Sequence, residues 1–184
     1  MSDELVSGLL KDTDLRVVLV TTAELSRLAR ATHKAEPAAA ALFSQALSVA
    51  ALMAALQKGD ESRINIQLEC DGPLRGLFVD GDTTGLLRGY VKNPYVEYVG
   101  AEGEYRWRPV LGNKGFISVL RQGGDGDYYR SSVELEHFDF VKDLENYFNI
   151  SDQVRTQLYL AQLPAAVDGT QEPLGKVAAH STNT

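Results

Sequence analysis

The chain has 184 residues, a formal net charge of -7 and 44% hydrophobic residues. This length accommodates one well-packed domain, and the composition is that of a globular protein rather than a disordered or collagenous one. The acidic balance argues against a duplex nucleic-acid binder, because counterion release requires a dense field of Lys and Arg. No nucleic-acid partner is therefore expected.

Cys70 is the single cysteine, which excludes an intramolecular disulfide and an all-cysteine metal site within the chain. The N-terminus, Met1-Ser2-Asp3-Glu4, lacks the basic region and the apolar run of a secretory signal. We therefore expect cytoplasmic residence and no membrane partner.

The chain is predicted to begin with a strand followed by two helices. Arg16 to Val20 is rich in β-branched residues, and the spacing of Thr21 and Glu24 is that of a capping box at the start of a short amphipathic helix. Pro37 to Leu56 then predicts a longer helix, with Pro37 at the first helical position and alanine on much of its surface. Its length would suit a membrane span, but its polar residues favour a buried core helix.

From Arg63 onward the hydrophobic period changes to two. Ile64, Ile66, Leu68 and Cys70 alternate with polar residues, which is typical of a strand covered on one face. Short glycine-containing turns link the strands that follow, and such turns indicate antiparallel pairing. The predicted strands after the first are Leu74 to Asp80, Leu86 to Val91, Phe116 to Arg121 and Tyr128 to Leu135.

The C-terminal third predicts one more helix and one more strand. Apolar residues from Phe140 to Phe148 indicate a helix capped at Asp139, and Val154 to Leu163 indicates a strand. Asp168-Gly169 has the composition of a hairpin turn. Tyr95 to Trp107 receives no assignment.

Several residue types that can carry chemistry have simpler structural interpretations. Cys70 shares a strand face with apolar residues, which favours a packed thiol over a nucleophile. Asp125 and Asp127 lie in a glycine-rich turn but lack the further oxygen ligands of a calcium loop. His33, His137 and His180 have no metal-binding spacing.

Two further patterns resemble nucleotide or nucleic-acid sites only in part. Gly112-Asn113-Lys114-Gly115 lacks the leading glycine and the Ser/Thr of a phosphate loop, so a turn entering a strand is favoured. Aromatic and basic residues alternate between 90 and 108 and could stack on a single strand, although the net acidity disfavours this function. These residues are Tyr90, Lys92, Tyr95, Tyr98, Tyr105, Arg106, Trp107 and Arg108.

The order of five short motifs resembles the redox-regulated 33-kDa heat shock protein family. The motifs are Leu68-x-x-Asp71-Gly72-Pro73-Leu74, Arg88-Gly89-Tyr90, Leu111-Gly112-x-x-Gly115-x-Ile117-x-Val119, Tyr129-x-x-x-Val133-x-Leu135 and Glu145-x-Tyr147-Phe148-x-x-Ser151-x-Gln153. The resemblance extends from about Leu15 to about Ala179.

This resemblance implies an ATP-independent holdase that binds unfolding proteins during heat or oxidative stress. In the family, an N-terminal α+β domain supports dimerisation and offers apolar surface to clients. A C-terminal domain holds zinc through four cysteines, whose oxidation releases the metal and exposes the binding surface. Unfolded clients and a second copy of the chain are the partners that the resemblance implies.

The chain departs from the family after Ala179. We expect residues 1–179 to be the N-terminal chaperone-type domain, incomplete at its C-terminal end, and 180–184 to be a tail that does not match. The linker helices and the four zinc cysteines are absent, so the sequence is either part of a longer protein or a naturally shortened homologue. If a strand normally follows Ala179, its loss should leave an open sheet edge that promotes self-association.

The predicted fold is α+β, with one twisted antiparallel or mixed sheet of about six to eight strands and the alanine-rich helix packed centrally on it. The leading function is a chaperone domain without the zinc switch. The alternatives are a dimerising remnant that binds no clients and, ranked last, an enzyme that uses His137 with Glu134 or Glu136. No catalytic, cofactor-binding or metal-ligating residue is expected, and the sequence does not identify the client-binding residues.

Overall fold

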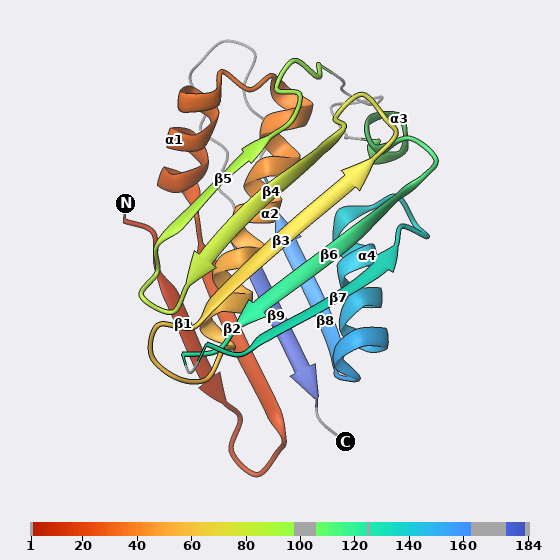
Figure 1. Ribbon diagram of the computed structural model, residues 1–184. Coiled ribbons are helices and arrows are strands. Elements are labelled where there is room, and N and C mark those ends of the chain that lie inside the picture. The colour runs from red at the N-terminus through yellow and green to blue at the C-terminus, as the bar shows by residue number, and fades with distance from the viewer. Residues whose placement is uncertain (1, 98–105, 125, 163–175, 183–184) are drawn as a thin grey trace.

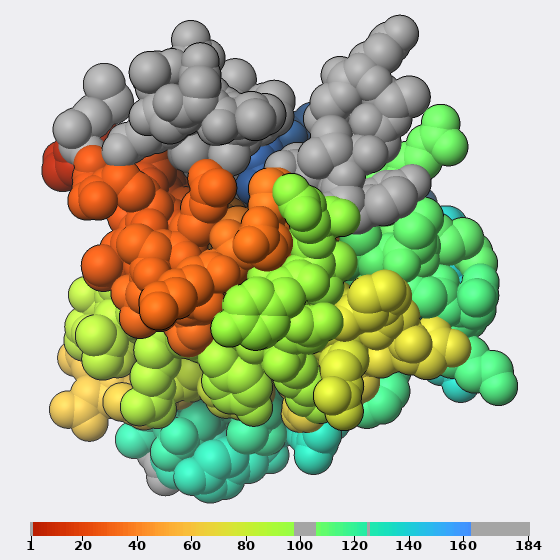
Figure 2. All heavy atoms as spheres, turned by 90° about the horizontal axis from the view of Figure 1, so that it is seen from above, coloured from red at the N-terminus to blue at the C-terminus, as the bar shows by residue number. Residues whose placement is uncertain are grey.

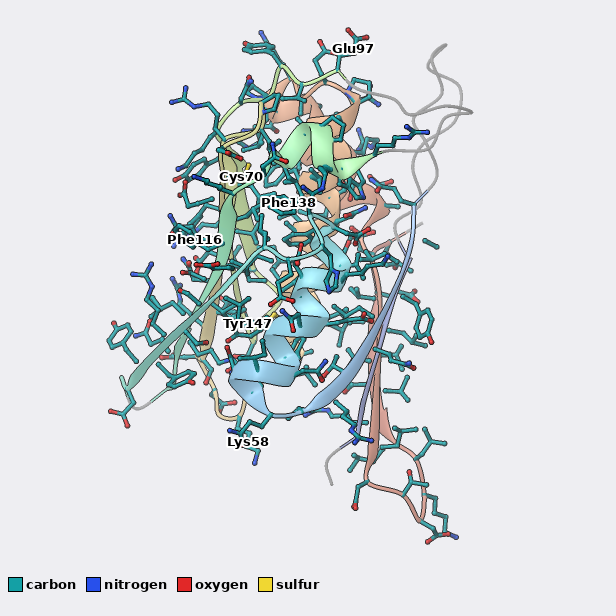
Figure 3. All side chains as sticks on the ribbon, turned by 90° about the vertical axis from the view of Figure 1, so that its right-hand side faces the viewer. Lys58, Cys70, Glu97, Phe116, Phe138 and Tyr147 are labelled. Carbon is teal, nitrogen blue, oxygen red and sulfur yellow. The ribbon has the colours of Figure 1, made fainter. Side chains whose placement is uncertain are left out.

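The computed structural model describes residues 2–97, 106–124, 126–162 and 176–182. Two antiparallel sheets lie on opposite sides of the molecule with helices between them (Figures 1 and 3). The elements in chain order are β1 (Leu5–Leu9), β2 (Leu15–Thr21), α1 (Ala23–His33), α2 (Pro37–Ala55), β3 (Arg63–Cys70), β4 (Gly76–Asp82), β5 (Leu87–Val91), α3 (Trp107–Leu111), β6 (Gly115–Gln122), β7 (Tyr128–Glu134), α4 (Phe140–Tyr147), the π-helical turn η2 (Phe148–Asp152), β8 (Arg155–Ala161) and β9 (Lys176–Thr182).

The predicted α+β class is confirmed, but the prediction of one sheet is wrong. The strands form a four-stranded sheet in the order β1-β2-β9-β8 and a five-stranded sheet in the order β5-β4-β3-β6-β7. The reason lies in α2, which is predominantly apolar and buried on every side, so that it packs against a sheet on each flank. Every residue from Ala38 to Ala54 is buried.

Helix α2 meets the length and composition of a membrane span, with a mean hydropathy of 1.7 over its most apolar window. Within the protein, 89% of that window is buried. The prediction of a core helix is therefore confirmed. Its many alanines let both sheets approach the helix axis closely, since a small side chain keeps the helix surface narrow.

The alternation predicted for β3 is confirmed. Ile64, Ile66 and Leu68 have no exposed surface, and the residues between them are half-buried on the opposite face of the sheet. Strand β3 pairs with β4 on one side and with β6 on the other. The five-stranded sheet thus turns one face to α2 and one to solvent.

The predicted capping box at Thr21 and Glu24 is wrong. The helix N-cap is Thr22, and the Thr21 hydroxyl instead accepts the Glu4 N–H at 2.9 Å. Asp3 caps the helix from a distant part of the chain, because its carboxylate accepts the N–H groups of Glu24 at 3.1 Å and Leu25 at 2.8 Å. Local spacing could not reveal a cap supplied by the N-terminal segment.

The first turn of α2 is also satisfied by a remote segment. The Glu36 N–H donates to the Pro94 carbonyl at 2.8 Å, and the Ala38 N–H donates to the Val96 carbonyl at 3.2 Å. These bonds provide partners for donors that a helix start leaves free. Figure 2 shows the orange segment around α1 and the start of α2 beside the light green segment that follows β5.

The C-terminal elements agree in part with the sequence. Asp139 caps α4 as predicted, since its carboxylate accepts the N–H groups of Val141 and Lys142, each at 3.2 Å. The strand predicted from Val154 is β8. Strand β9 pairs with β2 and β8 along its whole length and continues through the predicted change at residue 180. The Asp168-Gly169 turn lies outside the described residues.

Candidate functional site

Exposed apolar side chains gather around the β1–β2 hairpin. Strand β1 is exposed at every position, and Leu9 is the most exposed of its large side chains at 75%. Leu86, at the tip of the β4–β5 hairpin, is 59% exposed. Neighbouring exposed apolar side chains are a candidate interaction surface, whereas single scattered ones are the ordinary pattern.

A groove of about 670 Å³ runs between β1 and the β4–β5 hairpin. Its apolar lining comes from four different elements: Leu5 on β1, Val20 on β2, Leu25 on α1, and Ala51 and Ala55 on α2. Leu86 and Leu87 complete that lining on the hairpin side, while Asp3, Glu4, Asp82, Thr83 and Thr84 supply polar atoms. The groove thus combines an aliphatic surface with polar side chains along its walls.

Asp82 fixes the hairpin wall of this groove. Its carboxylate accepts the Thr84 hydroxyl at 2.6 Å and the N–H groups of Thr84 at 3.0 Å and Leu86 at 3.1 Å. The Thr84 hydroxyl is the largest cause that lowers the pKa of Asp82 below its usual range. An ionised Asp82 therefore holds the turn that presents Leu86 to solvent.

The opposite wall is fixed by Asp3, whose carboxylate joins the segment before β1 to the start of α1. Thr21 adds a second link through Glu4, because the Thr21 N–H donates to the Glu4 carbonyl at 2.8 Å. Backbone and side-chain bonds thus hold β1 in place although little of its side-chain surface is buried.

A second groove of about 530 Å³ lies at the far end of β1. Leu9, Arg16, Met53 and Phe148 contribute to its lining. The Arg16 guanidinium is engaged there, since it donates to the Ala55 carbonyl at the end of α2 at 2.9 Å. The two grooves meet β1 at opposite ends, Leu5 lining the first and Leu9 the second.

The solvent face of the five-stranded sheet is more polar. Phe78 and Tyr90 stack with ring centroids 5.5 Å apart, and Phe116 points outward from the same sheet (Figure 3). Ion pairs interrupt this aromatic surface, among them Arg88 to Asp80 at 2.8 Å. We therefore take the groove beside β1 as the candidate site.

Cys70 does not belong to that groove. The side chain is half-buried against the hydrophobic core, and burial is the largest cause that raises the pKa of its thiol. The interpretation as a packed thiol agrees with this environment.

The histidines and glutamates that the sequence analysis considered as metal ligands or catalytic groups do not line the groove beside β1. His33 packs edge-on against Phe43 with ring centroids 5.2 Å apart, whereas His137 is exposed beyond β7. Glu134 and Glu136 are exposed as well. In the described ranges, no three His, Cys, Asp or Glu side chains are grouped as metal ligands would be. Asp125 lies outside the described residues, and the side chain of His180 is not described either.

The Gly112 to Gly115 segment is a turn that enters β6, as predicted. Its N–H groups point to a side chain of the protein itself: the Asp71 carboxylate accepts those of Asn113 at 2.7 Å and Lys114 at 2.9 Å. A carboxylate at this position would repel a phosphate.

The aromatic and basic residues between 90 and 108 do not form one platform in the described part of the chain. Tyr90 stacks on Phe78, Lys92 pairs with Glu69, and the Arg108 guanidinium lies 4.3 Å from the centre of the Phe138 ring. Tyr98 and Tyr105 fall outside the described residues.

The sequence analysis missed β1 and the groove beside it. Leu5 to Leu9 shows no strict alternation, because Ser7 and Gly8 follow two apolar residues. The available signal was a short segment without charges, flanked by acidic residues on one side and Lys11 on the other.

Three comparisons bear on the identity of the chain. The family model described as Hsp33 protein matches residues 3–175. A 33 kDa chaperonin of a Cyanothece species is 35% identical over 161 residues, covering 87% of this chain and 54% of the relative. The 33 kDa chaperonin of Acaryochloris marina is 37% identical with the same coverage.

The solved structure of the 33 kDa chaperonin from Thermotoga maritima superimposes with a TM-score of 0.86 at 26% identity. The match covers 96% of this chain and 60% of that structure. The chain thus spans about half the length of the curated relatives that it matches. Both the sequence match and the fold lead to one conclusion: the chain belongs to the Hsp33 protein family, which is a family of chaperones and not of enzymes.

Proposed function

We propose that this chain is a client-binding domain of an ATP-independent holdase that takes up unfolding proteins under heat or oxidative stress in the cytoplasm. The observation that carries the proposal is the groove beside β1, which offers exposed leucines over an apolar floor. An unfolded segment supplies the matching apolar side chains, so its binding would remove both surfaces from water.

The groove suits clients that share no sequence. Its apolar lining is aliphatic, and two of its polar side chains, Asp3 and Asp82, already accept hydrogen bonds from the protein itself. The Gly112 to Gly115 turn is closed by Asp71, which supports binding without ATP. The family membership supports the chaperone class.

The proposal is tested by light scattering of a thermally unfolding client. Leu86→Asp places a charge on the groove wall, and we expect it to reduce the suppression of aggregation several-fold. Leu28→Asp is the matched control, because Leu28 on α1 is also 59% exposed but does not line the groove. Both side chains are exposed, so both variants should fold.

Equal suppression by the two variants would exclude the groove as the client site. If the unchanged chain fails to suppress scattering at a several-fold molar excess, the alternative of a dimerising domain without client binding replaces the chaperone proposal.

A further inference from the structure

We propose that one water molecule is bound inside the protein where α1, α2 and the end of β8 meet, and that it bridges the Ser26 hydroxyl to the side-chain carbonyl of Gln45. The site is a small cavity of about 10 Å³, and Ser26, Gln45 and Gln162 are among its lining residues. The proposal does not depend on the proposed function, because it concerns how the two helices are joined to each other and to the sheet.

The cavity lies in a polar part of an otherwise apolar core. Ser26 on α1 and Ser44, Gln45 and Ser48 on α2 are all buried, and all four line the cavity. A buried polar atom without a hydrogen-bond partner destabilises the folded state, because it has lost its bonds to solvent. The hydrogen bonds of each group therefore decide whether the site needs a further partner.

A backbone carbonyl fixes the orientation of the two side-chain amides at the site. The Gln162 Nε2 group donates to the Ala41 carbonyl at 3.2 Å, so Gln162 presents its Oε1 atom to Gln45. The Gln45 Nε2 group donates to that oxygen at 3.1 Å. Turning either amide over, or both, would place like groups against each other. The Gln45 Oε1 atom is the end that remains, and it is buried without a hydrogen-bond partner among the described residues.

Ser26 supplies the complementary group. Its backbone N–H donates to the Thr22 carbonyl at 2.9 Å, as in a regular helix, but its buried Oγ atom has no hydrogen-bond partner in the part of the chain that the structure describes. A hydroxyl can donate one hydrogen bond, and an amide oxygen can only accept. Since no direct bond joins the two atoms, a water between them can accept from Ser26 and donate to Gln45.

A third partner is available for the second hydrogen atom of this water. The Ser48 hydroxyl donates to the Ser44 carbonyl at 2.9 Å and lies 2.6 Å from the Thr22 hydroxyl, which therefore donates to it. The Ser48 oxygen can accept one further bond, and Ser48 lines the cavity. Three hydrogen bonds are the usual number for a buried water.

The size and the charge of the cavity select water over other ligands. A volume of about 10 Å³ is the space that a single bound water requires. The remaining lining residues, Leu160 and Ala161, are apolar, and no charged side chain is found among the described residues of the lining. An ion would therefore lie there without a counter-charge, at a large desolvation cost.

The bridge joins three elements that are remote in the chain. Helices α1 and α2 lie side by side (Figure 1), and Gln162 directly follows β8. The water extends the hydrogen-bonded chain that runs from the Ala41 carbonyl through Gln162 and Gln45, so that the chain reaches Ser26 on α1. It thereby connects α1 to the end of the four-stranded sheet.

A high-resolution crystal structure of the unchanged chain tests the site directly. We expect one ordered water within about 3.2 Å of both Ser26 Oγ and Gln45 Oε1. Magnetic relaxation dispersion of the solvent counts long-lived internal waters in solution, and Ser26→Val, which fills the cavity with methyl groups, should remove one of them. A direct bond between the two side chains, or an equal water count in Ser26→Val, would overturn the proposal.

Ser26→Ala tests the bridge through stability, with Thr32→Ala as the matched control. Thr32 is exposed on α1, so its replacement reports the higher helix propensity of alanine and should stabilise the protein. Ser26→Ala has the same advantage in propensity but removes a partner of the water. We expect its equilibrium constant for unfolding, measured in denaturant, to rise about two- to tenfold.

The opposite result would have a definite meaning. Without a bound water, the Ser26 hydroxyl would be a buried and unpaired group, and its removal would stabilise the protein at least as much as Thr32→Ala does. A Ser26→Ala chain that is as stable as the unchanged chain, or more stable, would therefore overturn the proposal.

Discussion

At the scale of single residues, Cys70 is a half-buried free thiol whose pKa is raised by burial. The rise in its pKa keeps the thiol protonated near neutral pH, and the thiolate is the form that reacts. A lone, protonated thiol beside a hydrophobic core therefore differs from the paired cysteines that act in redox switching.

We expect Cys70 to react slowly with thiol reagents at pH 7 and faster only as the pH rises above about 8.5, the ordinary range of a free thiol. Because the unfolded chain ionises before the folded one, the free energy of unfolding should fall as the pH rises through that range. The rate at which Cys70 reacts with a thiol reagent, followed against pH in native and in denatured protein, tests the first expectation.

Cys70→Ser should leave client suppression and its response to peroxide unchanged, at a stability cost of about 1–3 kcal/mol if the hydroxyl lacks a partner. Suppression must be compared on folded protein. If peroxide enhances suppression in the unchanged chain but not in Cys70→Ser, the thiol acts as a switch and the packed interpretation fails.

Asp82 is the residue whose ionisation stabilises the hairpin beside the groove. Its folded pKa is lowered, so its contribution is present above the unfolded pKa of about 3.9 and is lost as the pH falls through the folded value. Asp82→Ala should lower the free energy of unfolding at pH 7 by about 1–3 kcal/mol, because it leaves the Thr84 and Leu86 donors without this acceptor.

Denaturant unfolding at pH 7 and at pH 3 measures this effect, with the exposed Asp14→Ala as the control. The difference between Asp82→Ala and the unchanged chain should shrink at the lower pH. An equal difference at both values would show that the charge of Asp82 contributes nothing.

At the scale of elements, the N-terminal segment acts as a cap for α1. The sequence predicted a local capping box, but the structure uses Asp3, which lies beyond an intervening hairpin. One aspartate thus connects the stability of α1 to the position of β1 and to the groove between them.

Asp3→Ala should lower the free energy of unfolding by about 1 kcal/mol, the usual cost of losing a side-chain cap. Thermal unfolding followed by circular dichroism measures the loss. Ser2→Ala is the matched control, since Ser2 is the exposed neighbour. Equal melting temperatures for the two variants would mean that solvent replaces the Asp3 carboxylate without cost.

At the scale of the whole molecule, the donor set available for zinc is poor. Structural zinc takes four protein ligands, and Cys70, His33 and His137 lie on separate parts of the described fold. We propose that the family's zinc chemistry is not supplied by these residues.

Purified, tag-free protein should therefore contain far less than one zinc per chain, as measured by elemental analysis. Addition of zinc should leave the melting temperature unchanged, because a bound metal would stabilise the folded state. One tightly held zinc per chain would require a ligand set that the described residues do not show.

Local sequence determined the elements with strong periodicity. The apolar run of α2, the alternation of Ile64, Ile66 and Leu68, and the cap at Asp139 depend on neighbours within a few residues, so their patterns are visible along the chain. The motifs from Leu68 to Gln153 indicated the family for the same reason.

Tertiary structure alone decided the division into two sheets, because a predominantly apolar α2 is compatible with a sheet on one side or on both. It also placed β9 between β2 and β8, which puts β1 and β8 at the edges of that sheet and the segment after Ala179 in its interior. The groove brings together Leu5, Ala51 and Leu86 from distant parts of the chain. These residues come together only through packing between segments that are remote in the sequence, and no local pattern along the chain indicates that packing.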